Sequence, residues 1–379
     1  MSEAQHMLNL AARLASRAAG YVEPNPMVGC VIVKDGRVIG MGHHLVYGGP
    51  HAEVNALADC AARGGGEDPR GATVYVTLEP CAHHGKQPPC VDALITAGVA
   101  RVVCARRDPN PTALGGADRL AAAGIAFEIN EESHAAIRLS DPFIKRITTG
   151  LPWVIAKWAQ TIDGRIATRT GESKWISSEA SRRRVHRTRA RVDAILTAVG
   201  TLLADDPLLT ARAGWRRRRT ARRVVIDPAL EIPDSAGMLR TLDEAPVTIV
   251  CADNALRTRQ RTVATLTAMG VEVVALGLES GGEDEVGVDA TLRYLVSAHN
   301  ATNVLIEAGP GLLGRLFDAD LVDEAHVYIA PMLLADEQAK PAARGRAADK
   351  LSDAKRFTLD RTKRIGDDVL AIYRRSSST

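Results

Sequence analysis

Two successive blocks of short, Val/Ile-rich segments that alternate with helix-patterned segments constrain the fold of this chain most strongly. The first block has strand-like runs at residues 28–36, 38–42, 72–78 and 100–105, with helical periodicity at 51–62 and 89–98. The second has strand-like runs at 153–159, 193–197, 222–227, 247–252, 271–276 and 303–308, with helical segments between most of them. Strands that alternate with helices predict layered α/β domains.

The two blocks meet at residues 146–152, where Gly150 and Pro152 end a helical pattern before a new strand. A chain of 379 residues also exceeds the usual size of one domain. We therefore predict an N-terminal domain over residues 1–147 and a C-terminal domain over residues 148–379. Near the end of the chain, residues 324–334 and 367–375 are expected to form antiparallel strands.

Composition excludes several classes of protein. Apolar residues make up 46% and charged residues 25%, close to the average of globular domains, so disorder and coiled coil are excluded. Mean hydropathy is −0.07 and no stretch is apolar enough to span a bilayer, so no membrane partner is expected. The first segment lacks the basic-then-apolar order of a secretory signal and is typical of an amphipathic helix. A cytoplasmic location is the resulting expectation.

The charge is nearly balanced, with 48 basic and 45 acidic residues. This balance argues against a dedicated nucleic-acid-binding protein, for which a strongly basic chain is expected. Arginines nevertheless cluster at helical spacing over residues 182–191. We expect this cluster to contact an anionic ligand.

The most specific chemical signal is a set of metal-ligand residue types. His51 and Glu53 form an HAE motif, and Cys81 and Cys90 each follow a proline. One histidine and two cysteines suit tetrahedral zinc with a fourth position for water. Glu53, two residues after His51, is placed to move protons to and from that water without binding the metal. Zinc deaminases carry His-x-Glu followed by Pro-Cys-x-x-Cys. Here the cysteines are nine residues apart instead of three.

Another interpretation of the same residues is a structural zinc site with a fourth protein ligand from His83 or His84. The remaining four cysteines lie in apolar segments and are expected to be core residues. His43 and His44 are expected in a loop or at the surface, with His43 and His83 as further candidates for a pocket wall.

The sequence resembles a known family, the bifunctional riboflavin-biosynthesis deaminase/reductases. The resemblance covers nearly the whole chain in the family's order. It rests on PNPMVGCVIV (24–33), GPHAEVNAL (49–57), TLEPCAHHGKQPPC (77–90), DPNP (108–111), AKWAQTIDGRIA (156–167), GESKWIS (171–177), LADDPLLTAR (203–212) and EAGPGLLG (307–314).

For the N-terminal domain, the resemblance implies a cytidine-deaminase-like fold with one zinc ion. It implies His51, Cys81 and Cys90 as zinc ligands and Glu53 as the catalytic proton carrier. Asn25 lies where related deaminases hold the pyrimidine ring. The implied substrate is the small molecule 2,5-diamino-6-ribosylamino-4(3H)-pyrimidinone 5′-phosphate, which loses an amino group to water.

For the C-terminal domain, the resemblance implies a dihydrofolate-reductase-like α/β fold that uses NADPH to reduce the ribosyl group to ribityl, and a homodimer formed through this domain. Lys157 and Asp163 lie on the same motif without an assigned role. The implied cofactor residues are Ala159, Trp175, Thr201, Asp205, Gly309, Pro310, Gly311, Leu312, Leu313, Gly314 and Arg315. The implied substrate residues are Ser173, Arg189, Leu209, Arg212 and Glu307.

The chain departs from the family pattern in the second domain. Pro228 stands where Ser or Thr often contacts the nucleotide, and Ala335 stands where Gly is usual. An alternative function, a zinc deaminase acting on another nucleotide or on a nucleic-acid base, predicts exposed aromatic residues for stacking. Aromatic residues make up only 4% of the chain. A non-catalytic zinc-binding assembly module would leave Glu53 and the second domain without a role.

Overall fold

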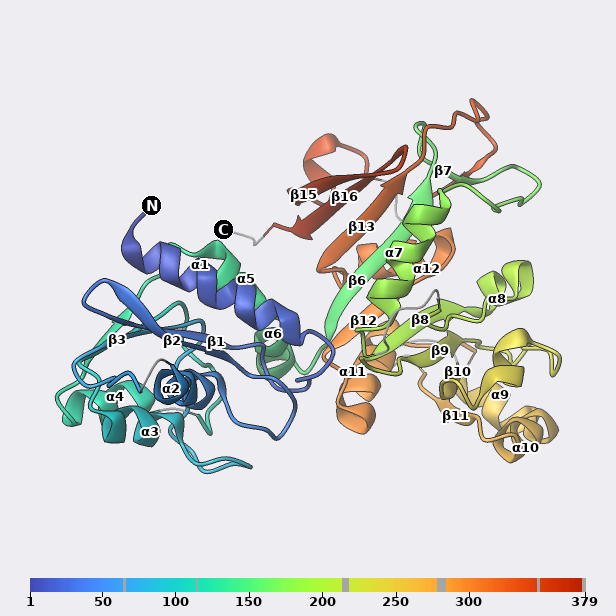
Figure 1. The fold of residues 1–379 in the computed structure, drawn as a ribbon. Coiled ribbons are helices and arrows are strands. Elements are labelled where there is room, and N and C mark those ends of the chain that lie inside the picture. The colour runs from blue at the N-terminus through green and yellow to red at the C-terminus, as the bar shows by residue number, and fades with distance from the viewer. Residues whose placement is uncertain (64–65, 114, 213–217, 278–283, 346–347, 377–379) are drawn as a thin grey trace. The chain divides into compact units, whose positions relative to one another are not determined.

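We describe the protein from a computed structural model. The described residues are 1–63, 66–113, 115–212, 218–277, 284–345 and 348–376. The chain divides into two compact units, Met1–Gly150 and Leu151–Thr379, which Figure 1 colours from blue to green and from green to red.

The N-terminal unit is built on a five-stranded sheet in the order β2-β1-β3-β4-β5. β1 pairs antiparallel with β2 and β3, whereas β3, β4 and β5 run parallel. The strands are β1 (Gly29–Lys34), β2 (Arg37–His43), β3 (Thr73–Val76), β4 (Arg101–Cys104) and β5 (Ala126–Ile129).

Helices cover both faces of this sheet because its strands are apolar on both sides. Along β1, Cys30 and Ile32 face the core under α2, α3 and α4, and Val31 and Val33 face the core under α1 and α5. A three-layer α/β/α unit results (Figure 1). The helices are α1 (Glu3–Ala15), α2 (Ala52–Ala62), α3 (Cys90–Ala97), α4 (Gly116–Ala122), α5 (His134–Leu139) and α6 (Asp141–Thr149), with a short 3-10 turn at Ser16–Ala18.

Glycines in β2 allow α2 to pack directly on the sheet. A Cβ at Gly42 would lie 2.3 Å from the backbone nitrogen of Ala56, and one at Gly40 would lie 2.5 Å from the Ala56 oxygen. No side chain fits at either distance. This close approach fixes the first turn of α2, which carries Glu53, against the end of the strand.

The C-terminal unit is built on a nine-stranded sheet in the order β11-β10-β9-β8-β12-β6-β13-β16-β15. Neighbouring strands are parallel from β11 to β13 and antiparallel from β13 to β15. The strands are β6 (Trp153–Gln160), β8 (Ala194–Ala198), β9 (Arg222–Ile226), β10 (Val247–Cys251), β11 (Glu272–Ala275), β12 (Asn303–Ile306), β13 (Glu324–Ile329), β15 (Phe357–Ile365) and β16 (Asp368–Arg375). A separate pair joins β7 (Arg165–Ala167) to β14 (Lys340–Pro341).

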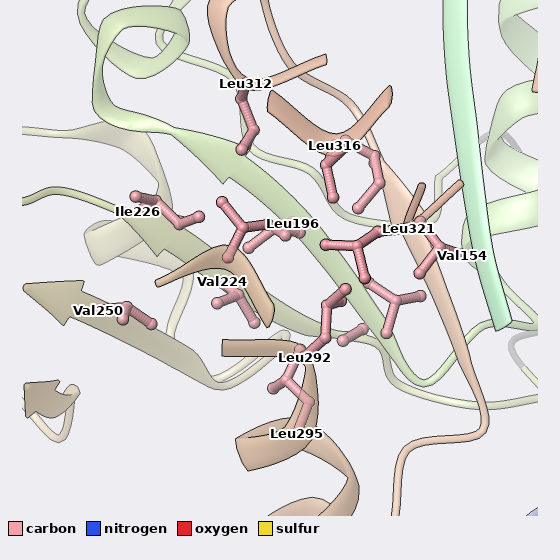
Figure 2. Packing of buried hydrophobic residues seen from close by; sticks show 14 of the residues in the cluster. Val154, Leu196, Val224, Ile226, Val250, Leu292, Leu295, Leu312, Leu316 and Leu321 are labelled. Atoms are coloured by element: carbon pink, nitrogen blue, oxygen red, sulfur yellow. The ribbon is translucent and has the colours of Figure 1, made fainter. Parts of the chain in front are cut away.

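Two cores lie on opposite faces of the large sheet. One contains side chains from α11 (Val288–His299) and α12 (Pro310–Asp318), and Figure 2 shows Leu292, Leu295, Leu312 and Leu316 packed against the strands. The other face is covered by α7 (Glu179–Arg189), α8 (Val199–Asp205), α9 (Asp253–Thr258) and α10 (Gln260–Ala268). Short 3-10 turns span Gly237–Thr241 and Leu351–Asp353.

The predicted α/β class and the strand-like runs of both blocks are confirmed. The expected antiparallel strands at 324–334 and 367–375 are confirmed, because β13 pairs antiparallel with β16; on its other side β13 pairs parallel with β6. β15 was not predicted from the sequence, because its mostly polar, exposed residues lack clear alternation. Ala335 has a backbone φ of 51°, in the left-handed region where glycine is favoured, which explains why glycine suits this position.

Candidate metal centre and second cavity

The predicted zinc ligands converge in the N-terminal unit. His51 is the N-cap residue of α2, Cys90 is the first residue of α3, and Cys81 lies in the loop between β3 and α3. Their candidate ligand atoms all lie within 4.8 Å of one another. The His51 Nδ1 atom is 3.3 Å from the Cys90 Sγ atom and 3.6 Å from the Cys81 Sγ atom.

These separations fit a tetrahedral metal. Zn–S bonds near 2.3 Å and Zn–N bonds near 2.0 Å place neighbouring nitrogen and sulfur ligands about 3.5 Å apart. A hydrogen bond from Cys90, together with His51, lowers the pKa of Cys81 despite its burial, so a thiolate forms readily. The residues present therefore suit zinc with three protein ligands.

Glu53 lies beside the three ligands, in the first turn of α2. Only 3% of its surface is exposed. Burial raises the pKa of Glu53 to about 7, and the neighbouring Cys81 adds to the effect. A carboxyl group with a pKa near neutrality can take up and return a proton at neutral pH. Its position and its pKa both suit a proton carrier.

Asn25 lines a cavity of about 240 Å³ that also contains His51, Glu53 and Cys81. Its side-chain Nδ2 lies 3.3 Å from the Nε2 atom of His44. The His44 Nδ1 atom lies 3.0 Å from the Pro50 carbonyl oxygen, which can only accept, so Nδ1 carries the hydrogen and Nε2 accepts from Asn25. The Asn25 oxygen has no hydrogen-bond partner among the described residues and is therefore available to an N–H group of a ligand.

His44 corrects the sequence expectation. It is 2% exposed and lines the cavity instead of lying at the surface. His83 also lines the cavity, with a buried Nδ1 that has no hydrogen-bond partner among the described residues. His43 is not among the lining residues. The pattern HH at 43–44 contains no signal that separates the two, because only the ends of β2 and α2 decide which ring turns inward.

The segment between the two cysteines forms part of the same cavity. Gln87 donates a hydrogen bond to the Gly48 carbonyl over 2.9 Å. The Lys86 ammonium lies 3.9 Å from the centre of the Tyr47 ring. The nine-residue cysteine spacing thus provides a loop that reaches across to residues 47–48. A three-residue spacing would be too short to provide it.

The four remaining described cysteines confirm the expectation of core residues, since Cys30, Cys60, Cys104 and Cys251 are free and buried. They take no part in the cluster of candidate metal ligands.

A second, larger cavity of about 840 Å³ lies in the C-terminal unit. Its walls come from the end of β6, from α7, from residues 200–212 and from the start of α12. The structure brings the following predicted residues to these walls: Ala159, Ser173, Trp175, Arg189, Thr201, Asp205, Leu209, Arg212, Glu307, Gly309, Pro310, Gly311 and Leu312.

Glu307 follows β12 directly and is the charged centre of this cavity. Its carboxylate accepts two hydrogen bonds from Arg189, of 2.5 and 3.0 Å, and one of 3.3 Å from Lys157. Burial alone would raise the pKa of Glu307, but the charges of Arg189 and Lys157 outweigh burial and lower it to about 2. The carboxylate is therefore ionised at neutral pH and is held rigidly at the end of its strand.

The start of α12 provides backbone donors to the same cavity. Gly309 is the N-cap residue, and its own N–H donates to the Thr201 hydroxyl over 2.9 Å. Free N–H groups at a helix N-terminus favour an anionic group such as a phosphate. Ser173 donates to Asp205 over 2.9 Å, which joins two other predicted residues.

Three predicted cofactor residues lie outside the cavity wall. Leu313 is fully buried in the core. Gly314 packs so closely on the chain that a Cβ would lie 1.4 Å from the Arg344 carbonyl oxygen. Arg315 donates to the Val286 carbonyl over 2.6 Å. The helical turn explains this, because consecutive residues of α12 face different directions and only its first turn faces the cavity.

Asp163 is a turn residue. It accepts hydrogen bonds from the Thr161 hydroxyl and from the backbone N–H groups of Leu334 and Ala335. Lys157 contacts Glu307 directly, although its motif alone indicated no role.

Comparison with known proteins identifies the family. Residues 152–371 match the model of the RibD C-terminal domain, and residues 1–106 match the cytidine and deoxycytidylate deaminase zinc-binding region. The riboflavin biosynthesis protein RibD of Escherichia coli (strain K12) is 40% identical over 96% of this chain and 97% of its own length. The chain belongs to the RibD family.

Solved RibD structures agree with the fold. Acinetobacter baumannii RibD (form 1) is 34% identical, has a TM-score of 0.82 and covers 99% of both chains. A Thermotoga maritima deaminase/reductase is 30% identical, with a TM-score of 0.81 over 98% of this chain and 99% of that one. The predicted cytidine-deaminase-like and dihydrofolate-reductase-like α/β fold is confirmed.

Membership in the RibD family confirms the predicted activity class, a bifunctional deaminase and reductase of riboflavin biosynthesis. The family models and the His/Cys/Cys cluster confirm a deaminase domain of the zinc-binding kind and a reductase domain of the NADPH-using kind. Small molecules are the substrates of such an enzyme. Within the described part of the chain, every helix is too short or too polar to cross a bilayer.

Proposed function

We propose that this chain catalyses two successive steps on one small molecule. The first is deamination of 2,5-diamino-6-ribosylamino-4(3H)-pyrimidinone 5′-phosphate by water. The second is reduction of the ribosyl group to ribityl by NADPH, which gives 5-amino-6-(5-phosphoribitylamino)uracil. The observation that carries the proposal is the buried Glu53 beside a His/Cys/Cys ligand set, in a chain whose other unit carries the cavity around Glu307.

In the deaminase step, we assign His51, Cys81 and Cys90 to zinc. Bound zinc would activate the attacking water. Glu53 would accept the proton that this water gives up and would deliver it to the leaving amino nitrogen, so that ammonia departs. The Asn25 side-chain oxygen, fixed by the hydrogen bond to His44, would accept from an N–H group of the pyrimidine ring.

In the reductase step, NADPH supplies the hydride, and the residues of the chain position C1 of the sugar. We assign the cofactor to the wall formed by Ala159, Trp175, Thr201, Asp205 and residues 309–312. Residues 313–315 are left out of this assignment because they face away from the cavity.

Substrate binding in the second cavity is assigned to Ser173, Arg189, Leu209, Arg212 and Glu307. The guanidinium group of Arg189 already donates two hydrogen bonds to Glu307. The exposed Arg212 is therefore the better phosphate ligand of the two arginines. The ionised Glu307 carboxylate suits the hydroxyl groups of the sugar, because a carboxylate accepts hydrogen bonds from O–H groups.

We further propose that residues 1–147 carry the deaminase step and residues 148–379 the reductase step. A homodimer through the reductase unit is supported by the exposed edge strand β15, which ends the nine-stranded sheet. Sedimentation would test it, since a monomer mass at micromolar concentration would contradict it. Zinc thiolate ligands and free buried thiols suit the reducing cytoplasm.

Mass spectrometry of the diaminopyrimidinone ribosylamine phosphate tests both steps. The zinc-loaded protein is incubated with this compound, with and without NADPH. We expect exchange of an amino for an oxo group without NADPH, followed by the gain of two hydrogen atoms when NADPH is added.

Deamination without reduction would contradict the second step and direct attention to Pro228, where the sequence departs from the family pattern. No reaction in either tube, with bound zinc verified, would contradict the substrate assignment and favour a deaminase of another nucleotide.

A further inference from the structure

His186 lines the C-terminal cavity and is not among the residues assigned to the cofactor or the substrate. His186 lies on α7, beside the loop over residues 205–212, and both line the C-terminal cavity. We propose that His186 is a positioning residue of the reductase site: it accepts the backbone N–H of Arg212 and thereby places the Arg212 side chain for the substrate phosphate. This inference rests on the proposed reductase function.

The Nδ1 atom of His186 lies between two backbone groups of the loop. It is 3.1 Å from the Arg212 nitrogen and 3.1 Å from the Thr210 carbonyl oxygen. A neutral ring nitrogen either accepts or donates, so one tautomer can serve only one of these groups. The Thr210 carbonyl keeps a hydrogen-bond donor in either tautomer, because it also accepts a hydrogen bond of 3.3 Å from Arg189. The Arg212 N–H has Nδ1 as its acceptor among the described residues. The geometry therefore assigns an unprotonated Nδ1 and a hydrogen on Nε2.

Burial and the surrounding charges both favour the neutral form of this ring. Burial lowers the pKa of His186, and the positive charges of Arg189 and Arg212 lower it further. The Thr210 carbonyl and Glu307 act in the opposite direction, but more weakly. Since the imidazolium form carries a hydrogen on both nitrogens, only the neutral ring can accept the Arg212 N–H.

The rest of the loop is anchored from the core, which leaves Arg212 dependent on α7. Leu209 has a φ of 51° and a side chain that is only 3% exposed, packed in the core. The Leu208 carbonyl accepts a hydrogen bond from the fully buried Arg223 over 3.2 Å. A left-handed leucine persists only where its surroundings hold it. His186 extends this restraint to Arg212, because its Nδ1 atom accepts a hydrogen bond from the Arg212 backbone N–H.

His186 and Arg189 on α7 together connect the Arg212 loop to Glu307. Arg189, one helical turn after His186 on α7, holds both the Thr210 carbonyl and the Glu307 carboxylate. His186 and Arg189 therefore fasten adjacent peptide groups of the loop to one helix face. The phosphate ligand and the group proposed for the sugar hydroxyls are thereby kept at a fixed separation.

Four variants separate this role from a general structural one. His186→Ala removes the ring, and His186→Asn restores an acceptor oxygen close to the position of Nδ1. His186→Gln instead extends toward the position of Nε2. Thr188→Ala, on the same helix and outside the cavity lining, is the matched control. Steady-state NADPH oxidation is measured with 5-amino-6-(5-phosphoribosylamino)uracil and with its unphosphorylated riboside, and deamination is measured in the same preparations.

We expect His186→Ala to raise KM for the phosphorylated substrate about tenfold, because an N–H group loses its acceptor. The kcat value should change less, kcat/KM for the riboside should stay near the wild-type value, and His186→Asn should recover most of the loss. Equal losses with both substrates, wild-type behaviour of His186→Ala, or recovery by His186→Gln alone would each overturn the proposal. Failure of the wild-type protein to oxidise NADPH while it still deaminates would instead contradict the proposed reductase function, and the inference with it.

Discussion

Replacing Glu307 by glutamine should destabilise the C-terminal unit strongly, because it keeps the shape of the side chain and removes its charge. The folded structure lowers the pKa of Glu307 from 4.5 to about 2. At about 1.4 kcal/mol per pKa unit, the ionised form contributes roughly 3 kcal/mol to the free energy of unfolding at pH 7. Glu307→Gln should lose about that amount, because the Arg189 and Lys157 side chains, only 12% and 21% exposed, lose their counter-charge.

Urea unfolding followed by tryptophan fluorescence reports on the C-terminal unit, since all four tryptophans lie after residue 150. The sign of the pH dependence follows from the lowered pKa. The contribution is fully present above the ordinary carboxyl pKa and is lost as the pH falls toward 2, so the difference between wild type and variant should shrink from pH 7 to pH 4.

The matched control is Glu179→Gln, which removes an exposed charge paired with Arg183 on α7. It should change the free energy of unfolding by less than about 0.5 kcal/mol. If Glu307→Gln were as stable as this control at pH 7, or if its deficit grew as the pH fell, the account of a buried, ionised carboxylate would be refuted.

Three further outcomes are expected. Glu53→Gln should retain bound zinc, measured by elemental analysis, and lose deamination by at least about a hundredfold while NADPH oxidation continues; surviving deamination would rule Glu53 out as the proton carrier. Chelation of zinc should abolish deamination and leave reduction of the deaminated intermediate intact; loss of both activities would show that the two units depend on one metal. Gly314→Ala should destabilise the C-terminal unit by about 2 kcal/mol or more, because its Cβ would overlap the Arg344 carbonyl oxygen. Gly311→Ala on the same helix, where a Cβ meets nothing within 4 Å, should be neutral or slightly stabilising in urea unfolding. Equal effects of the two glycine substitutions would contradict the packing described for α12.

The sequence was sufficient for features that depend on local pattern. Short apolar runs predict most strands of both sheets, because a strand buried on both faces needs a continuous apolar run. The ligand set of His51, Cys81 and Cys90 is predictable because zinc restricts its ligands to few residue types, and the pairing with Glu53 adds a spacing that chance seldom provides.

Other features depend on contacts between residues far apart in the chain. His44 could not be separated from His43 by sequence, since its buried ring contacts Asn25, Pro50 and His51 only in the folded chain. Lys157 cannot be told apart from the other eight lysines of the chain until β6 and β12 pair side by side and bring it to Glu307.

The turn of α12 likewise decides that residues 309–312 face the cavity and that residues 313–315 do not, although the motif is continuous in sequence. A motif specifies which residue types are present. The fold decides which of them share a surface, because side-chain direction is set by helix rotation and strand register. The sequence therefore predicted the two activities and the candidate zinc ligands. Only the tertiary structure decided the hydrogen-bond partners of Glu307, the orientation of Asn25 and the place of His186.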